Sequence, residues 1–370
     1  MACQGTGGTP SEPTGSGATV TTEGRDWARA TRGTLRHVGY QSMTASIDQL
    51  LAAKGHLVAD GAMGTQLFAV GLSAGDPPEA WNALHSEQVR AIHRSYLQAG
   101  ADLVITNSFG GTSFRLALHG CQDRGIELNR AAARNARIEA DAEMGRTGRR
   151  VVVAGSMGPT GELLQPLGNM SPEACEAAFA EQAEGLAAGG ADVLWVETMS
   201  DLDEVEAAVR GARSACDLPV AATMSFDTAG RTMMGVTGTE LAERLGGLGL
   251  AAMGANCGNN IADTEAAVTA IAAASPGTPV ISKPNAGVPV WSGDSLVYDG
   301  TPEVLAAHAH RARKAGVTVI GSCCGSTPAH TAKIAAVLRG DEPPPEIEPE
   351  PSASPGTEDR MARRRTRRRA

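Results

Sequence analysis

The chain is poor in aromatic residues and contains no long apolar run. Phe, Trp and Tyr make up only 3% of its 370 residues, so a core must be packed mainly from Val, Leu, Ile and Ala. No apolar run reaches the roughly 18 residues that a transmembrane helix requires. The first residues also lack the positive segment and the apolar segment of a secretory signal. These absences predict a protein without a membrane span or a secretory signal.

An excess of positive charge is missing as well. The formal net charge is −9, which argues against a general nucleic-acid-binding protein. The one basic block, 363–369, is interpreted as a solvated tail. The seven cysteines are odd in number and lack the spacing of a disulfide framework. This pattern favours a reducing compartment, and we expect a cytoplasmic protein.

Both ends of the chain are expected to be disordered. Residues 1–44 are rich in Gly, Thr and Ser and show no sustained period, and 341–370 is acidic and proline-rich before it becomes arginine-rich. Between them, 45–340 is predicted to be one folded domain that begins with a short capped helix. Whether Met43 is the true start of the protein stays open.

The central part alternates short apolar runs with amphipathic stretches. Continuous runs of Val, Ile, Leu and Ala are typical of parallel strands that are buried on both faces. Strands are predicted at 56–60, 102–106, 151–154, 192–197, 219–224, 250–255, 279–282 and 317–321. A hydroxyl residue precedes proline at Ser171, Thr301 and Thr327, and each pair predicts the start of a helix. Glycines at 100, 189, 316 and 340 are placed to end helices.

Eight strand–helix units over this length predict a (β/α)₈ barrel of the TIM type. A doubly wound open sheet is the alternative, but no Gly-x-Gly-x-x-Gly sequence follows the first strand. The unusual polar and glycine-rich clusters fall just after strands, and in a barrel all these loops meet at one rim. That rim would bring Cys257 close to the adjacent pair Cys323 and Cys324.

Three thiols at strand ends, each flanked by glycine, are predicted to bind a soft divalent metal. Three cysteines with one open position are typical of a catalytic zinc, because a structural zinc is closed by four protein ligands. The alternative is that Cys257, Cys323 and Cys324 are small buried residues. We assign no metal to Cys121, Cys175 or Cys216. His330 is not expected to be a fourth ligand, because a closed shell would leave no place for substrate.

With these motifs, the chain resembles the homocysteine S-methyltransferase family of zinc-dependent barrels. The resemblance covers about residues 45–340. It depends on the segments DGAMGT at 60–65, TNSFGGT at 106–112, ET at 197–198, GANC at 254–257 and GSCCG at 321–325. One departure is Ser322, where the family has a second glycine before its cysteine pair.

The resemblance implies a set of site residues. The zinc thiolates would be Cys257, Cys323 and Cys324. Asp60 and Glu197 would bind the amino group of homocysteine, and the backbone from Gly61 would hold its carboxylate. Asn107, Asn256 and Phe109 are further candidate substrate contacts. The alternatives are that Asp60 caps a turn, that Glu197 pairs with a neighbouring cation, and that the two asparagines only satisfy loop backbone.

The methyl donor is less clear. Betaine is favoured, because the chain is most similar to bacterial betaine-type members, although a quaternary ammonium prefers an aromatic cage. Candidate cage walls are Phe109, Trp81, Trp195 and Trp291. S-methylmethionine, or a methylated corrinoid on a partner protein, is the alternative donor, and 283–287 resembles corrinoid-dependent members. A non-catalytic zinc- or homocysteine-binding module is the other alternative, and the oligomeric state stays open.

Overall fold

The computed structural model describes residues 46–227, 229–287, 290–292 and 295–348. The predicted disordered segment 1–44 and the end of the C-terminal tail, 349–370, lie outside these residues, and so do the side chains of 290–292 and 295–297.

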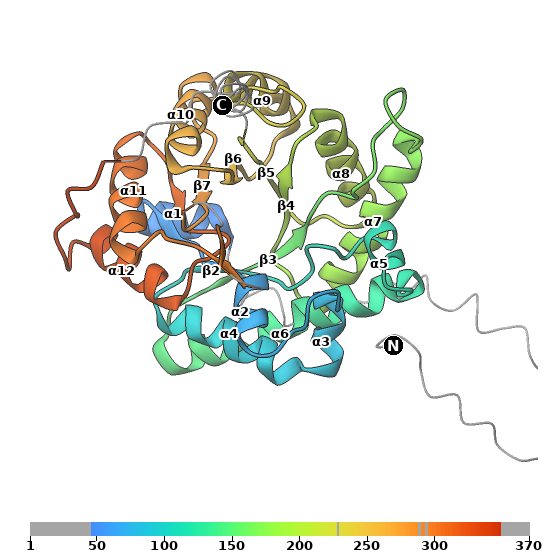
Figure 1. Ribbon diagram of the computed structural model, residues 1–370, viewed down its shortest axis with the longest axis horizontal. Coiled ribbons are helices and arrows are strands. Elements are labelled where there is room, and N and C mark those ends of the chain that lie inside the picture. The colour runs from blue at the N-terminus through green and yellow to red at the C-terminus, as the bar shows by residue number, and fades with distance from the viewer. Residues whose placement is uncertain (1–45, 228, 288–289, 293–294, 349–370) are drawn as a thin grey trace, which may run out of the picture. The chain divides into compact units, whose positions relative to one another are not determined.

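Eight parallel strands form one sheet that curves into a barrel (Figure 1). Their order is β1-β10-β7-β6-β5-β4-β3-β2, and a parallel bridge between Ala59 and Leu103 joins the two outer strands. The strands are β1 (Leu57–Val58), β2 (Leu103–Ile105), β3 (Val152–Met157), β4 (Val193–Met199), β5 (Val220–Met224), β6 (Ala252–Cys257), β7 (Val280–Pro284) and β10 (Val319–Ile320). All eight predicted strands are present, and the predicted (β/α)₈ architecture is confirmed.

Helices follow the strands and surround the sheet (Figure 1). The α-helices are α1 (Ile47–Lys54), α2 (Gly64–Ala69), α3 (Trp81–Leu84), α4 (Ser86–Gln98), α5 (Ser113–Ala117), α6 (Gly125–Thr147), α7 (Pro172–Gly189), α8 (Leu202–Ala215), α9 (Gly238–Leu245), α10 (Ile261–Ala274), α11 (Pro302–Lys314) and α12 (Pro328–Arg339). Short 3₁₀ turns are η2 (Pro78–Ala80), η3 (Gln122–Arg124) and η4 (Gly246–Leu248). Ser171, Thr301 and Thr327 are the N-cap residues of α7, α11 and α12, as their sequences predict.

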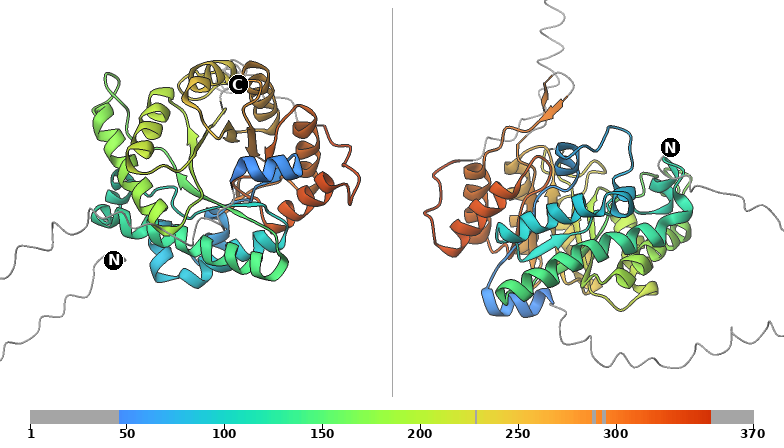
Figure 2. Two further views of the ribbon diagram at one scale, coloured as in Figure 1. Left: turned by 180° about the vertical axis from the view of Figure 1, so that it is seen from behind. Right: turned by 90° about the horizontal axis from the view of Figure 1, so that it is seen from below.

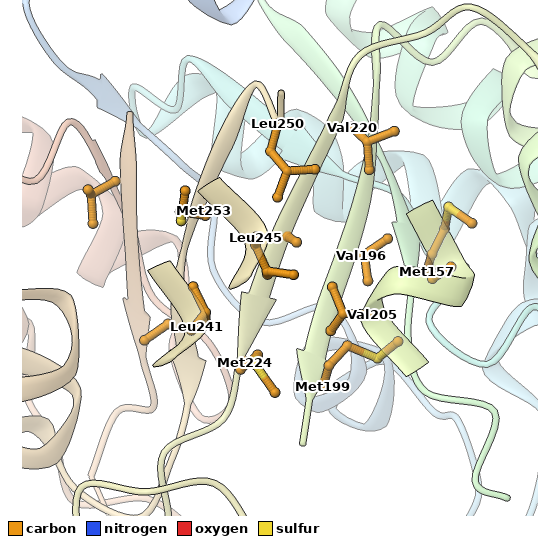
Figure 3. Close-up of a cluster of buried hydrophobic side chains, with 14 of the residues drawn as sticks. Met157, Val196, Met199, Val205, Val220, Met224, Leu241, Leu245, Leu250 and Met253 are labelled. Atoms are coloured by element: carbon orange, nitrogen blue, oxygen red, sulfur yellow. The ribbon is translucent and has the colours of Figure 1, made fainter. Parts of the chain in front are cut away.

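The hydrophobic core has an inner and an outer part. Inside the barrel, Leu57, Ile105 and Trp195 belong to one buried cluster, to which Ile47 of α1 adds from the amino ends of the strands (Figure 2). The outer faces of the strands pack against the helices, for example Val196, Met224 and Leu241 in Figure 3. The filled interior leaves the carboxyl-terminal rim as the place for a site.

Two features near the end of the chain were not predicted. Strands β8 (Val290–Ser292) and β9 (Ser295–Val297) pair as an antiparallel hairpin between β7 and α11. Residues 341–348 contact the last two helices: Lys333 pairs with Glu342, and Arg311 donates to the carbonyl of Ile347. Among the described residues, no helix is long and apolar enough to cross a bilayer.

A candidate metal and substrate site

One cavity of about 410 Å³ lies at the carboxyl ends of the strands. The residues that line it come from the ends of β2, β3, β4, β6 and β7 and from the loops after β1, β2 and β10. All three candidate metal ligands line this cavity, together with Glu197 and Lys283. The sequence clusters that follow the strands therefore meet in one place, as the barrel topology requires.

Cys257, Cys323 and Cys324 form a compact group of thiols. Their sulfur atoms lie within 4.8 Å of one another, and the Sγ atoms of Cys257 and Cys323 are 2.9 Å apart. Gly325 has a φ of 79°, and a Cβ atom there would lie 2.1 Å from the ring of Tyr298. Three sulfur donors at this spacing fit a soft divalent cation and leave room for one exogenous ligand.

The three thiols share their protons unequally. Hydrogen bonds with the other two thiols, and then burial, raise the pKa of Cys257. The hydrogen bond with Cys257 lowers the pKa of Cys323, but the hydrogen bond with Cys324 and burial outweigh it and raise that pKa. Hydrogen bonds with Cys257 and Cys323 lower the pKa of Cys324 to about 3. Three adjacent thiolates would repel one another, so one negative charge is held by two neighbouring S–H donors. A bound cation would remove this repulsion and displace the remaining protons.

Asn256 joins the ends of β4, β5 and β6. Its Oδ1 accepts from the amide of Thr198 at 2.8 Å and from the hydroxyl of Thr223 at 2.6 Å, while its Nδ2 donates to Thr198 Oγ1 at 2.6 Å. Nδ2 also lies 3.5 Å from the Sγ of Cys257. The side chain is 1% exposed and does not line the cavity. Its predicted contact with substrate stays untested, whereas its position beside the sulfurs is clear.

Glu197 presents a buried carboxyl group to the cavity. Its Oε1 accepts from the hydroxyl of Ser156, and no hydrogen bond to its Oε2 occurs among the described residues. Burial, followed by the nearby sulfur of Cys323, raises the pKa of Glu197 to about 7, although the ammonium of Lys283 opposes the shift. Such a carboxylate is stabilised by any cation that enters the cavity.

Asp60 lies between β1 and the rim with both carboxylate oxygens engaged. Oδ1 accepts from Lys283 Nζ at 2.8 Å and Oδ2 accepts from the amide of Ile105 at 2.7 Å. Burial raises the pKa of Asp60, and the Lys283 ammonium partly offsets that effect. The neighbouring backbone is also occupied, since the Ala62 amide donates to Ser326 Oγ at 3.0 Å.

Lys283 is not among the site residues predicted from the sequence, although it belongs to the segment 283–287 that resembles corrinoid-dependent members. Its side chain is 2% exposed. Lys283 lies one residue before the end of β7 and lines the cavity. Although burial alone would lower the pKa of Lys283, the carboxylates of Asp60 and Glu197 raise it. The available signal was a lysine at the end of a buried strand, where an unpaired cation would be costly.

The other predicted contacts lie near the mouth of the cavity. Phe109 is 38% exposed and lines it, as do Gly61 and Asn107. The Nδ2 atom of Asn107 donates to the Pro78 carbonyl at 2.7 Å, and the backbone carbonyl of Asn107 accepts from Nδ2 of Asn82. Asn107 therefore also holds the loop, which is the structural role considered for it in the sequence.

An aromatic cage from the predicted walls is not assembled among the described side chains. Trp195 is fully buried in the inner core, and Trp81 packs beside His85 with ring centroids 4.3 Å apart; neither lines the cavity. The side chain of Trp291 lies outside the described residues. Of the three candidates whose side chains the structure describes, Phe109 alone lines the cavity.

His330 is not placed as a metal ligand. Its Nδ1 accepts from the Thr327 amide at 3.1 Å, and its Nε2 lies 2.8 Å from the Gly300 carbonyl. The group that can hold a metal in the described part of the chain contains the three cysteines and no histidine. Cys175 and Cys216, to which no metal was assigned, are outside that group.

A sequence profile described as homocysteine S-methyltransferase matches residues 57–338, the barrel that carries this cavity. The chain belongs to the homocysteine S-methyltransferase family. The methionine synthase of Mycobacterium tuberculosis is 35% identical over 311 residues, which cover 80% of the chain and 26% of that relative. The methionine synthase of Mycobacterium leprae is 34% identical over 297 residues, covering 76% and 24%. The chain thus spans about a quarter of the length of these relatives.

A solved member of the homocysteine S-methyltransferase family has a similar fold along nearly its whole length. The homocysteine methyltransferase MmuM from Escherichia coli, in its metallated form, matches with a TM-score of 0.65 and 27% identity. The match covers 78% of the chain and 98% of that structure. Its oxidized form matches with a TM-score of 0.65 and 28% identity, covering 78% and 97%.

Proposed function

We propose that this protein is a zinc-dependent methyltransferase that transfers a methyl group from a small donor to the thiol of homocysteine and forms methionine. The observation that carries the proposal is the convergence of three cysteine sulfurs with a buried, otherwise unpaired carboxylate in one cavity. Sulfur ligands suit a thiol substrate at the open metal position, and the carboxylate suits its ammonium group. Family membership supports the same reaction.

Cys257, Cys323 and Cys324 would hold the zinc. Bound there, zinc would lower the pKa of the substrate thiol so that the nucleophilic thiolate is present at neutral pH. Asn256 donates toward the sulfur of Cys257 and fixes the strand end from which that ligand projects. We assign it this positioning role in place of the predicted contact with substrate, because its side chain does not line the cavity.

Glu197 is proposed to accept a charge-assisted hydrogen bond from the substrate ammonium. The hydroxyl of Ser156 holds one of its oxygens and leaves the other directed to the ligand. Asp60 and the Gly61 backbone would form the rest of the amino-acid site, as the family resemblance implies. In the reaction, the sulfur–carbon bond forms as the bond between the methyl carbon and the donor atom breaks, and the thiol proton passes to solvent.

Betaine remains the proposed donor, with S-methylmethionine and a methylated corrinoid partner as alternatives. A methylammonium or sulfonium group would approach past Phe109, whose ring offers an attractive face to a cation. Arg115 also lines the cavity and supplies a positive charge for the carboxylate of such a zwitterionic donor. Together these two groups favour a small zwitterion.

The test is methionine formation from homocysteine by the zinc-loaded protein. Betaine, S-methylmethionine and methylcobalamin are supplied in separate reactions, and a Cys324→Ser variant is the matched control. Turnover with betaine that the variant lacks is expected. If only one of the other donors supports turnover, that compound and not betaine is the methyl donor. Stoichiometric homocysteine binding without methionine from any donor would favour the non-catalytic module instead.

A further inference from the structure

Lys283 has spare hydrogen-bonding capacity inside the cavity. A lysine ammonium has three N–H donors. One donates to Asp60 Oδ1 at 2.8 Å, and the part of the chain that the structure describes offers no second hydrogen-bond partner. Because the side chain is 2% exposed, bulk water has little access to the remaining donors. A buried cation of this kind is stabilised by a ligand that brings an acceptor to it.

Asp60 is poorly suited to be the main acceptor for a substrate ammonium. Both of its oxygens already accept hydrogen bonds, and its charge is compensated by Lys283. The Ala62 amide, which lies in the backbone expected to receive the substrate carboxylate, already donates to Ser326 Oγ at 3.0 Å. Glu79 and Arg115 also line the cavity, but Glu197 and Lys283 lie close enough to each other and to the sulfur of Cys323 for these groups to shift the pKa values of both. Glu197 and Lys283 are therefore the acceptor and the cation beside the sulfurs, and both are less fully hydrogen-bonded than Asp60.

An acceptor and a cation side by side match an α-amino acid, whose ammonium and carboxylate share one carbon. We propose that Lys283 binds the α-carboxylate of the amino-acid substrate, that Glu197 binds its ammonium, and that Asp60 holds Lys283 in position. This assignment rests on the proposed function and names a specificity residue for the same site. It makes Asp60 a positioning residue, in contrast to the direct role that the family resemblance implies.

The experiment removes the substrate carboxylate and the lysine charge in turn. Wild-type and Lys283→Met proteins, full-length and zinc-loaded, are compared on homocysteine and on 3-aminopropane-1-thiol, which lacks only the carboxylate. We expect Lys283→Met to lower kcat/KM for homocysteine by about 10- to 100-fold, the size of one lost charge-assisted hydrogen bond. The value for 3-aminopropane-1-thiol should change by less than about threefold, because the lost contact is absent from that substrate.

The ratio of the two kcat/KM values separates this role from a structural one. If Lys283 only supports Asp60, both substrates lose activity equally, the ratio is unchanged, and the proposal is overturned. A third substrate, 4-sulfanylbutanoate, retains the carboxylate but lacks the amine. Its kcat/KM should fall in Lys283→Met as it does for homocysteine, whereas Glu197→Gln should leave it nearly unchanged.

A second variant removes the risk that an unpaired Asp60 prevents folding. The double variant Asp60→Asn/Lys283→Met leaves neither charge unpaired and should show the same collapse of the substrate ratio. Zinc content and thermal unfolding are measured for each variant. Wild-type protein that forms no methionine from homocysteine would refute the proposed function itself. A wild-type protein that does so, with the substrate ratio preserved in both variants, would refute only the assignment of Lys283.

Discussion

The carboxyl group of Glu197 sets the pH range in which the cavity can hold a cation. Burial, and then the nearby sulfur of Cys323, raise its pKa to about 7. Above that pH the group is a carboxylate and attracts an ammonium; below it, the group is neutral and loses that attraction. The free enzyme should therefore bind homocysteine less well as pH falls through 7.

We predict that kcat/KM for homocysteine decreases below a pH of about 7, the pKa of Glu197 in the unliganded site. Glu197→Gln should be about 10- to 100-fold less active at neutral pH and should lack this acidic limb. Steady-state rates between pH 5.5 and 8.5 test the prediction, with zinc content measured at each pH. An acidic limb that persists in Glu197→Gln at constant zinc content would assign the titration to another group.

Metal binding gives the second prediction at the scale of residues. Cys324→Ser should lose most of its zinc and keep its fold, because the three sulfurs lie at the surface of the cavity and not in the packed core. Cys216→Ser, which changes a half-buried cysteine outside the group, is the matched control and should retain zinc. Metal analysis measures the zinc content of both variants, and circular dichroism shows whether both are folded. Equal zinc in both variants would remove Cys324 from the ligand set.

At the scale of elements, the carboxyl ends of β4 and β6 are held in unfavourable backbone conformations. Thr198 has a φ of 60° and Cys257 a φ of 57°, in the left-handed region that costs about 1–3 kcal/mol for a residue other than glycine. The hydrogen bonds of Asn256 to Thr198 and Thr223 offset this cost. Thr198 and Cys257 thereby face one another, with 3.8 Å between Thr198 Oγ1 and Cys257 Sγ.

Asn256→Ala should destabilise the protein by about 2–4 kcal/mol, since buried donors on Thr198 and Thr223 lose their acceptor. Zinc affinity should fall as well, because Cys257 is no longer fixed. Urea unfolding and competition with a chelator measure the two effects. The control is Asn259→Ala, three residues along the chain, where the side chain is exposed. Equal losses in the two variants would show that Asn256 has no special role.

The strands and the thiol group could be predicted from local sequence, but the arrangement of charge could not. Apolar runs mark all eight barrel strands, and glycine beside cysteine marks the three candidate ligands. The pair of Asp60 and Lys283 joins residues 223 positions apart, so no local pattern reports it. The β8–β9 hairpin was missed because each of its strands contains a serine and forms no continuous apolar run.

For the whole molecule, the barrel is complete only when β1 lies between β2 and β10. Residues that follow the barrel in the sequence contact its outer helices. Residues 341–348 contact α11 and α12 through Arg311 and Lys333. This segment was expected to be disordered, and these contacts predict that it adds to the stability of the barrel.

We predict that a protein of residues 43–341 unfolds cooperatively and keeps its activity, because the cavity is lined by residues between 61 and 324. A protein of residues 43–348 should be more stable by about 1 kcal/mol, since it retains the contacts of Arg311 and Lys333. Thermal unfolding and methionine formation are measured for both. Loss of activity in a folded 43–341 protein would show that a terminal segment contributes to the site.

The placement of the site residues along the chain also fixes when the site can exist during synthesis. Asp60 leaves the ribosome well before Lys283 and the pair Cys323 and Cys324, and β1 can pair with β10 only after residue 320 has been made. A nascent chain can therefore present Cys257 but cannot enclose a metal ion. A zinc ion bound by all three thiols could therefore enter the site only after Cys323 and Cys324 have been made.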